Sequence, residues 1–312
     1  MHDRPLLTTE YDDPTEFQPV ASSLYIFGSR TEERTQHLNQ WRANVTDLEA
    51  LEIQEVNKDL IKLASVDTQT IALRDRNEIL SLFQHRTHKT LYLDITGLSN
   101  HVWPAILKTG INLGMSCNIV YVEPKSYAYS ASPRENVIFD LSERIIGISP
   151  IPQFSNLAEP PEEDITLVPL LGFEGARFSH LIEQIQPPGD NIDPIIGIPG
   201  FRAEYPFFAY QGNQIPLKNS RSHKNVRFAK ANCPFSLFYT LKDIADSYSS
   251  TQFLKIGLIG TKPHALGAVL YSMIHSGKAE LVYDHTKRKP GRSSGQSHCL
   301  VYPISTFLNR MS

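Results

Sequence analysis

Two segments of the chain share one order of strand, glycine-containing loop, helix and strand. The first covers residues 91–124 and the second residues 254–286, and they align with Gly97 opposite Gly260. In each segment an apolar stretch typical of a buried strand runs into the loop, and the apolar spacing of a helix follows. A strand that returns through a helix to a parallel neighbour is the basic unit of an α/β sheet. The repeated order therefore predicts α/β architecture.

The rest of the chain continues this alternation of strands and helices. It predicts an α/β fold with a Rossmann-like, mostly parallel sheet and flanking helices, built as one sheet or as two quasi-repeated lobes. Residues 1–20 are polar and contain prolines, and they predict an extended tail. Residues 21–150 then form an N-terminal Rossmann-like lobe and residues 151–312 a C-terminal one. The proline-punctuated stretch 125–163 is the expected crossover between them.

Composition excludes several classes of protein. The formal net charge is −3, which provides no global attraction to nucleic acid or to an anionic membrane. The three cysteines are widely separated and odd in number, so neither a disulfide framework nor a paired-cysteine metal site is expected. A reduced, cytoplasmic protein fits this pattern. No apolar run reaches transmembrane length, and nothing in the sequence indicates a membrane partner, a metal or a cofactor.

The loop of the second segment has the features of an anion site. Thr261 can cap a helix, and Pro263 suits its first turn because the N–H that proline lacks has no partner there. Gly260 lets the backbone turn, and Lys262 adds a positive charge beside the positive end of the helix. Gly260, Thr261 and Lys262 are therefore candidate ligand-binding residues. The alternative is a tight turn with a solvated lysine.

Two further loops follow predicted strands at equivalent positions. One contains Gly28, Ser29 and Arg30, and the other contains Glu174 and Arg177. A cation at the start of a helix is disfavoured by the dipole unless an anion is present, so both arginines are candidate phosphate ligands, together with Gly28 and Ser29. Glu174 is a candidate general base by position, with simple complementing of the helix dipole as the alternative.

The first segment places an acidic residue inside an apolar strand. Asp94 must be paired or hydrogen-bonded if it is buried, since an isolated buried carboxylate is expensive. It either holds the loop by accepting backbone N–H bonds or faces a ligand hydroxyl, which makes it a second candidate catalytic group. Thr96 and Gly97 follow it and are candidate ligand-binding residues.

Two basic stretches lie late in the chain, over residues 218–230 and 284–292. The second contains Arg288 in a loop rich in Gly, Ser and Pro, and it predicts a mobile basic lid over an anionic ligand. The alternative for both stretches is a solvated, mobile surface loop. No helix-turn-helix, zinc-finger or RRM signature is present, so sequence-specific DNA binding is not expected.

Residues 94–97 (DITG) and 260–263 (GTKP) together resemble the Thr-Gly-Gly-Thr-Lys-Pro type loop of CRISPR-associated Rossmann-fold (CARF-like) proteins, with the motif divided here between two loops. Proteins of that family bind cyclic oligoadenylates at a dimer interface, and some degrade them or carry a nuclease domain. The resemblance implies a nucleotide ligand, a homo-oligomer or protein partner, and a prokaryotic antiviral context.

These features predict a protein that binds a nucleotide or another phosphate-bearing ligand, as a sensor or accessory component of a defence system. An enzyme of nucleotide breakdown, either a hydrolase or an N-glycosidase, is the first alternative, with Glu174 or Asp94 as its acid–base group. A ligand-free protein-interaction module is the second. The P-loop, the nucleophile elbow and the HExxH zinc motif are all absent.

Overall fold

The computed structural model describes residues 4, 6–28, 32–66, 69–156, 160–188, 191–249 and 251–311. The chain forms two compact units. Unit 1 contains residues 128–292 and the N-terminal residues up to 6, and unit 2 contains residues 7–127 and 293–312. The lobe boundary predicted from the sequence, at residue 150, lies inside unit 1. The prediction also placed residues 293–312 in the C-terminal lobe, whereas they belong to unit 2 with residues 7–127.

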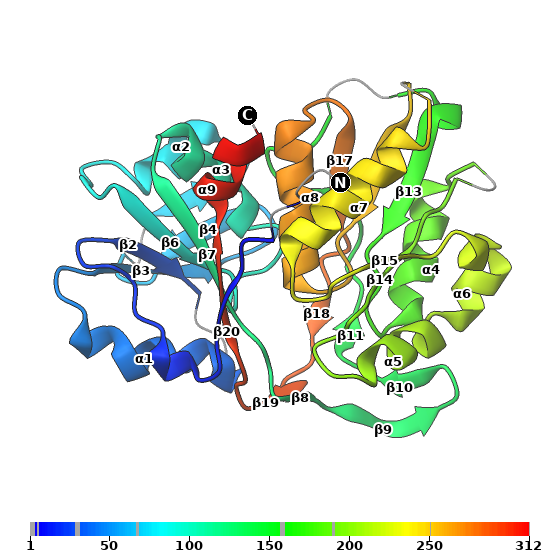
Figure 1. Cartoon of the computed structure of the whole chain (residues 1–312), viewed down its shortest axis with the longest axis horizontal. Coiled ribbons are helices and arrows are strands. Elements are labelled where there is room, and N and C mark those ends of the chain that lie inside the picture. The colour runs from blue at the N-terminus through cyan, green and yellow to red at the C-terminus, as the bar shows by residue number, and fades with distance from the viewer. Residues whose placement is uncertain are drawn as a thin grey trace. The chain divides into compact units, whose positions relative to one another are not determined.

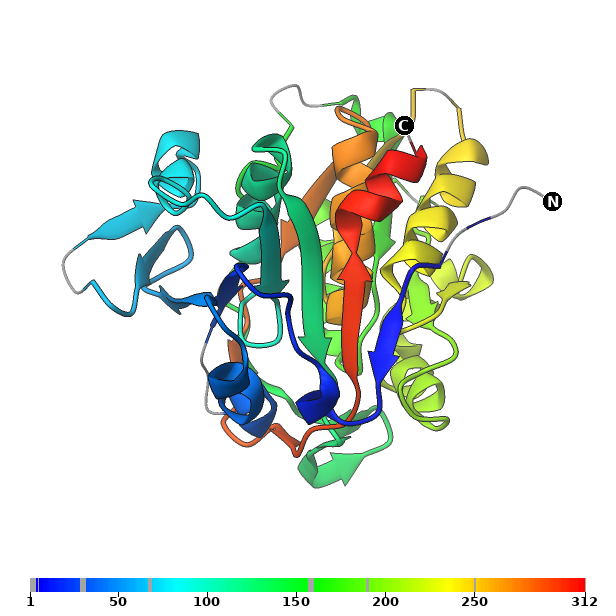
Figure 2. The same cartoon turned by 60° about the vertical axis from the view of Figure 1, so that its left-hand side comes forward.

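Unit 2 is built on an eight-stranded sheet (Figures 1 and 2). Its strands, in spatial order, are β1 (Thr9–Tyr11), β20 (Cys299–Pro303), β7 (Ser116–Val122), β6 (Thr90–Asp94), β2 (Leu24–Phe27), β3 (Glu49–Glu55), β4 (Leu60–Leu63) and β5 (Thr70–Ala72). Figure 2 shows the red strand β20 between the blue β1 and the green β7, and both of these pairings are antiparallel.

The prediction of a Rossmann-like, mostly parallel sheet is wrong. Three pairings of the eight-stranded sheet are parallel, those joining β7, β6, β2 and β3, whereas the other four are antiparallel. The turn between β3 and β4 shows one physical reason. It is short, and the Asn57 side chain accepts the N–H groups of Asp59 and Leu60 at 2.9 Å each. A connection this short permits only antiparallel pairing.

Short helices accompany this sheet. They are α1 (Leu38–Trp41), α2 (Arg76–Ser81), α3 (Trp103–Asn112) and α9 (Ile304–Met311), with 3-10 turns at Pro14–Glu16, Glu33–Gln36 and Arg42–Asn44. Within the residues that the structure describes, no helix is both long and apolar enough to cross a membrane. The N-terminal stretch is more than an extended tail, because β1 pairs with β20 and Phe17 is only 2% exposed.

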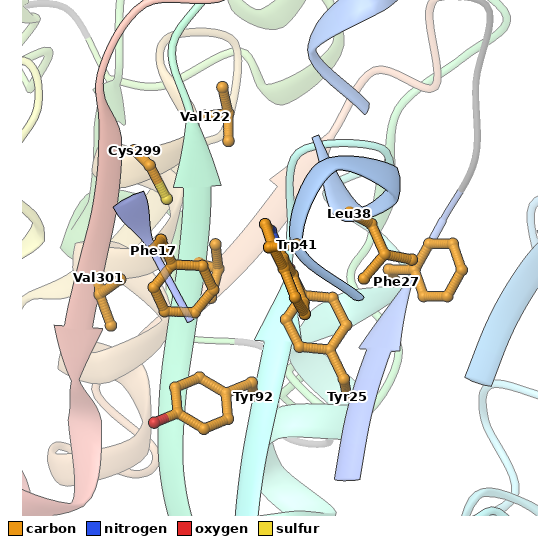
Figure 3. Close-up of a cluster of buried hydrophobic side chains, with 10 residues drawn as sticks. Phe17, Tyr25, Phe27, Leu38, Trp41, Tyr92, Val122, Cys299 and Val301 are labelled. Carbon is orange, nitrogen blue, oxygen red and sulfur yellow. The ribbon is translucent and has the colours of Figure 1, made fainter. Parts of the chain in front are cut away.

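Phe17 belongs to an aromatic cluster on one face of the sheet (Figure 3). Its ring meets Trp41 edge to face at 5.6 Å and Tyr92 at 5.8 Å. Trp41 in turn packs on Tyr25 at 5.1 Å, again edge to face. Such pairs stabilise beyond the area that they bury, so strands β2 and β6, helix α1 and the N-terminal segment share one core.

Unit 1 contains a four-stranded sheet in the order β12 (Ser149–Pro150), β17 (Ala279–Tyr283), β16 (Phe253–Gly257) and β13 (Ile165–Pro169), and a two-stranded sheet of β14 (Ile195–Gly197) and β15 (Arg227–Ala229). The pairings β13/β16, β16/β17 and β14/β15 are parallel. Isolated bridges from Leu167 to Ile192 and from Leu170 to Ile195 place β14 beside β13.

The helices of unit 1 are α4 (Gly175–Ile185), α5 (Tyr205–Gly212), α6 (Gln214–Asn219), α7 (Pro234–Asp246) and α8 (Lys262–Ile274). Helices α7 and α8 pack against each other (Figure 1). The shorter elements are β9 (Tyr129–Arg134), β10 (Val137–Phe139), β11 (Ser142–Arg144), β18 (Lys287–Arg288) and 3-10 turns at Glu162–Asp164 and Ser222–Lys224; β8 (Ser126–Tyr127) and β19 (Ser293–Ser294) pair within unit 2.

Both of the repeated segments fold as strand, loop, helix and strand, with parallel pairing of β6 with β7 and of β16 with β17. The loops differ in length. Helix α8 begins immediately after its cap Thr261, whereas α3 begins at Trp103, well beyond Gly97.

Gly97 lies against the backbone of Gly28, at the carboxyl ends of β6 and β2. A Cβ atom at position 97 would stand 1.6 Å from the carbonyl oxygen of Gly28. Real Cβ atoms do not approach backbone oxygens so closely, so this contact requires glycine, and a side chain would push the two strand ends apart.

We therefore expect Gly97→Ala to lower the free energy of unfolding by about 3 kcal/mol or more, because backbone must move. Urea denaturation measures it. The control is Gly114→Ala: Gly114 has open space around its Cβ position and a φ of +72°, so the same change there costs only about 1 kcal/mol of conformational strain. Equal effects of the two substitutions would contradict the close approach at Gly97.

Candidate functional site

A cavity of about 290 Å³ lies in unit 1 at the N-terminus of α4. The first residues of that helix line it, and so does the segment that runs from β10 into β11. In full, the lining residues are Asn136, Val137, Phe139, Asp140, Ser142, Glu143, Arg144, Ile145, Glu174, Gly175, Ala176 and Arg177. Because α4 follows β13, the cavity stands at the carboxyl edge of the parallel strands, which is where open α/β sheets bind ligands.

Arg177 is one of two arginines that line this cavity, the other being Arg144. Its Nε donates to Asp284 Oδ2 at 2.6 Å and its Nη2 to Asp284 Oδ1 at 2.8 Å, in a two-point pair. Its Nη1 donates to the carbonyl oxygen of Ile259 at 3.2 Å. A guanidinium has five N–H donors, and these contacts use three of them. The other two have no acceptor within the described part of the chain.

Asp284, which directly follows β17, is completely buried. Burial alone would raise the pKa of its carboxyl group, but the charge and hydrogen bonds of Arg177, with a further bond from the Thr286 hydroxyl at 3.1 Å, lower that pKa below its usual value. The partner anion expected for Arg177 from its place at a helix start is therefore supplied by the protein. The sequence places Asp284 at the start of the basic stretch 284–292 and does not indicate this pairing.

Glu174 holds the wall of the cavity. Its Oε1 accepts the N–H groups of Leu141 and Ser142 at 2.9 Å each, and its Oε2 accepts the Ser142 hydroxyl at 2.7 Å. Both oxygens thus tie the start of α4 to the beginning of β11. This geometry makes Glu174 a positioning residue and lends no support to its expected role as a general base.

Arg288 lies next to this wall, since β18 pairs with β11 and places Arg288 opposite Ser142. Within the stretch expected to form a mobile lid, Lys287 and Arg288 form the short strand β18. The lysines on either side of Arg288 are paired, with Lys287 Nζ 2.6 Å from Glu143 and Lys289 Nζ in contact with Asp140. Of the three candidates, Glu174 and Arg177 line the cavity, and Arg288 lies beside its wall without lining it.

The loop of Gly260, Thr261 and Lys262 lies one strand away, after β16. Thr261 caps α8 as expected, since its Oγ1 accepts the His264 N–H at 3.3 Å and donates to the carbonyl oxygen of Ala231 at 2.9 Å. That cap and Pro263 leave few N–H groups of the first turn to receive an anion. Lys262 is only 6% exposed, so the alternative of a solvated lysine is wrong.

Gly260 and Gly172 mark where the loops after β16 and β13 meet. A Cβ at Gly260 would stand 2.7 Å from the carbonyl oxygen of Leu170, and one at Gly172 would stand 2.8 Å from that of Ile259. Arg177 donates to the same Ile259 carbonyl. The GTKP loop is thereby connected to the cavity through backbone contacts, although its residues do not line the cavity.

The remaining candidates of the sequence lie in unit 2. Gly28, Asp94, Thr96 and Gly97 gather at the carboxyl ends of β2 and β6, where the Thr96 hydroxyl accepts the Val122 N–H at 2.9 Å. Ser29 and Arg30 fall outside the described residues.

Asp94 accepts three hydrogen bonds in the core of unit 2. The donors are His37 Nε2–H at 2.7 Å, the Tyr25 hydroxyl at 3.1 Å and the Thr96 N–H at 2.8 Å. The Trp41 indole N–H, which can only donate, points at His37 Nδ1 at 3.3 Å and so places the His37 proton on Nε2.

Burial alone would raise the pKa of Asp94, but His37 and Thr96 lower it below its usual value. Asp94 therefore holds the loop, the first of the two roles open to it. The sequence did not single out His37 and Trp41; their spacing of four residues, one helical turn, was the available signal.

No known family model matches the chain, and no curated protein matches its sequence. Within the described residues, no group of three or more His, Cys, Asp or Glu side chains is arranged to hold a metal ion.

Removing the Asp94 carboxylate would leave three buried donors without their acceptor, each at a cost of about 1–3 kcal/mol. We expect Asp94→Ala to lower the free energy of unfolding by about 3–5 kcal/mol, measured by urea denaturation. The control Asp59→Ala breaks a surface pair with Arg74 and should cost less than about 1 kcal/mol. If Asp94→Ala proves no more destabilising than the control, Asp94 is not the hub of this core.

His264 predicts a pH dependence of stability. Its ring is fully buried, and Nε2–H donates to the Lys230 carbonyl oxygen at 3.2 Å. Burial lowers its pKa from the ordinary 6.5 to about 4. The unfolded chain therefore binds a proton that the folded protein does not between these values, so stability falls as the pH falls through this window.

Between pH 7 and pH 5 we expect this histidine to account for a loss of about 2 kcal/mol in the free energy of unfolding. His264→Gln keeps an N–H donor and cannot titrate, so the variant should lose about 2 kcal/mol less than the wild type over that interval. Urea denaturation at both pH values measures the difference. Equal losses of unfolding free energy in the two proteins would show that His264 takes up its proton over this pH interval in the folded protein as it does in the unfolded chain.

Proposed function

We propose that unit 1 binds a small phosphate-bearing ligand of the nucleotide type in the cavity at the N-terminus of α4, and that it recognises this ligand without turning it over. The observation that carries the proposal is the guanidinium of Arg177, which lines the cavity with two N–H donors beyond those engaged by Asp284 and Ile259. Oriented N–H donors at a helix start are suited to phosphate oxygens.

Recognition is favoured over turnover by the carboxylates that line the cavity. Glu174 accepts three hydrogen bonds from the protein. Asp140 pairs with Lys289, and Glu143 pairs with Lys287. Each candidate acid or base of the cavity wall is thus committed to a protein partner. The role in antiviral defence and the expected homo-oligomer or protein partner rest on the resemblance of short loops, and they stay predictions.

The proposal is tested at Ala176, an exposed residue in the first turn of α4 that lines the cavity. An aspartate there suits the helix dipole, so Ala176→Asp should leave stability unchanged within about 0.5 kcal/mol. Its charge should repel a phosphate and weaken binding about tenfold or more, equivalent to about 1.4 kcal/mol. Calorimetric titration with inorganic phosphate, AMP, ATP and cyclic oligonucleotides measures this effect.

Gln184→Glu is the matched control, because it adds the same charge to an exposed position near the other end of α4. It should bind the ligand as the wild type does. Chromatography of each mixture after incubation detects turnover. Equal weakening of binding by both substitutions, or binding unaffected by Ala176→Asp, would show that the cavity is not the binding site. Consumption of the nucleotide would show that the protein is an enzyme and that the proposal of recognition without turnover is wrong.

A further inference from the structure

One stretch of unit 1 is depleted of negative charge. Residues 205–242 contain no Asp or Glu, whereas they contain six Lys and Arg, in a chain whose net charge is −3. The stretch is ordered: it forms α5, α6, the 3-10 turn Ser222–Lys224, β15 and most of α7. Its positive charge therefore belongs to a fixed surface rather than to the mobile loop considered from the sequence.

Four of these cations are exposed and unpaired. Lys218 lies on α6. Arg221 directly precedes the 3-10 turn Ser222–Lys224, and Lys224 is the last residue of that turn. Lys230 directly follows β15. Within the described part of the chain none of the four forms an ion pair. Arg227 differs, because its Nε lies 3.8 Å from Asp193.

Exposed aromatic rings accompany these cations. Helix α5 buries Tyr205, Ala209 and Gly212, while Phe207 and Tyr210, three residues apart, share its outer side. Phe207 is 74% exposed and Tyr210 46% exposed. Exposed apolar residues that gather in one patch mark interaction sites, in contrast to residues that are exposed singly.

Phe228 of β15 lies on the face of the β14/β15 sheet that packs against α5 and α6. It pairs in register with Ile196 of β14, so the two side chains point to the same face. Ile196 packs there with Ala209 of α5 and Leu217 of α6. Phe228 is nevertheless 56% exposed, which places its ring at the open edge beside those helices and between the cations of the 3-10 turn and Lys230.

From this combination we propose that the surface formed by α5, α6, the Ser222–Lys224 turn and β15 binds single-stranded nucleic acid without sequence preference. Unpaired cations complement the phosphates of the strand, and exposed rings offer faces on which unpaired bases stack. A duplex keeps its bases stacked internally and would leave the rings uncovered. The proposal is independent of the ligand of the α4 cavity.

The test uses the full chain and a fluorescein-labelled oligothymidylate of about 12 nucleotides, a length in the range of known single-strand sites. Fluorescence anisotropy over a series of salt concentrations yields the affinity and its salt slope. The triple variant Lys218→Ser, Lys224→Ser, Lys230→Ser should flatten the slope of log K against log salt by about 2, since each phosphate contact contributes about 0.7. Lys58→Ser, in unit 2, should leave the slope unchanged.

The aromatic arm separates stacking from charge. Phe228→Ala should weaken binding about fivefold or more with the salt slope retained, whereas Phe228→Trp, which keeps a ring, should bind as the wild type does. Thermal melting confirms that each variant is folded. The cavity variant Ala176→Asp should bind the oligonucleotide normally.

Several results would overturn the proposal. These are the absence of oligonucleotide binding, a slope unchanged in the triple variant, or equal affinity for a duplex of the same length with no effect of Phe228→Ala. Displacement of the oligonucleotide by polyglutamate at equal charge concentration would indicate an acidic protein partner instead. Binding to phosphatidylserine vesicles without oligonucleotide binding would indicate a membrane surface.

Discussion

A buried carboxylate at the end of a parallel strand is the constraint on which each unit depends. Asp94 ends β6 in unit 2, and Asp284 directly follows β17 in unit 1. Both are almost fully withdrawn from water, so each needs donors around it, and the chain supplies them from distant segments: His37 and Tyr25 in one case, Arg177 in the other. Because an unpaired buried charge is far more costly than a paired one, these contacts hold the starts of α1 and α4 against the strand ends. The loops around the strand ends take their shape from that requirement.

Much of the local structure could be read from the residues. The apolar runs that end at Asp94 and Gly257 are strands, Thr261 is a helix cap, and the two segments of strand, loop, helix and strand form with parallel pairing. The direction of the other strand pairings could not be predicted from the residues, because a short apolar strand has the same sequence pattern whether its neighbour runs parallel or antiparallel. The sheet of unit 2 combines parallel and antiparallel pairings for two reasons. The tight turn at Asn57 makes β4 antiparallel to β3, and β20 pairs antiparallel with β7, which lies much earlier in the sequence.

The candidate site divides in the same way. The sequence singled out Glu174, Arg177 and Arg288 from their places after strands. Glu174 and Arg177 do line one cavity, and Arg288 pairs with its wall at Ser142. It could not reveal what those side chains touch. The anion of Arg177 is Asp284, more than a hundred positions away, and the partners of Glu174 are backbone N–H groups of β11 and the residue before it. Long-range pairing of this kind depends on the tertiary path of the chain, which spacing in one sequence does not record.

The route of the chain has a consequence for modularity. Apart from the N-terminal residues up to 6, unit 1 is one long insertion into the sequence of unit 2, and the residues on either side of it, β8 and β19, are hydrogen-bonded to each other as an antiparallel pair. The insertion therefore starts and finishes at neighbouring points, as in domains that have been inserted into a host without disturbing its sheet. Arg4 belongs to unit 1 but lies outside the insertion, and its Nη2 donates to Asp243 Oδ1 at 2.7 Å. A fragment of residues 128–292 would thus contain nearly all of unit 1. Unit 2 without this fragment would need only a short turn to join β8 to β19.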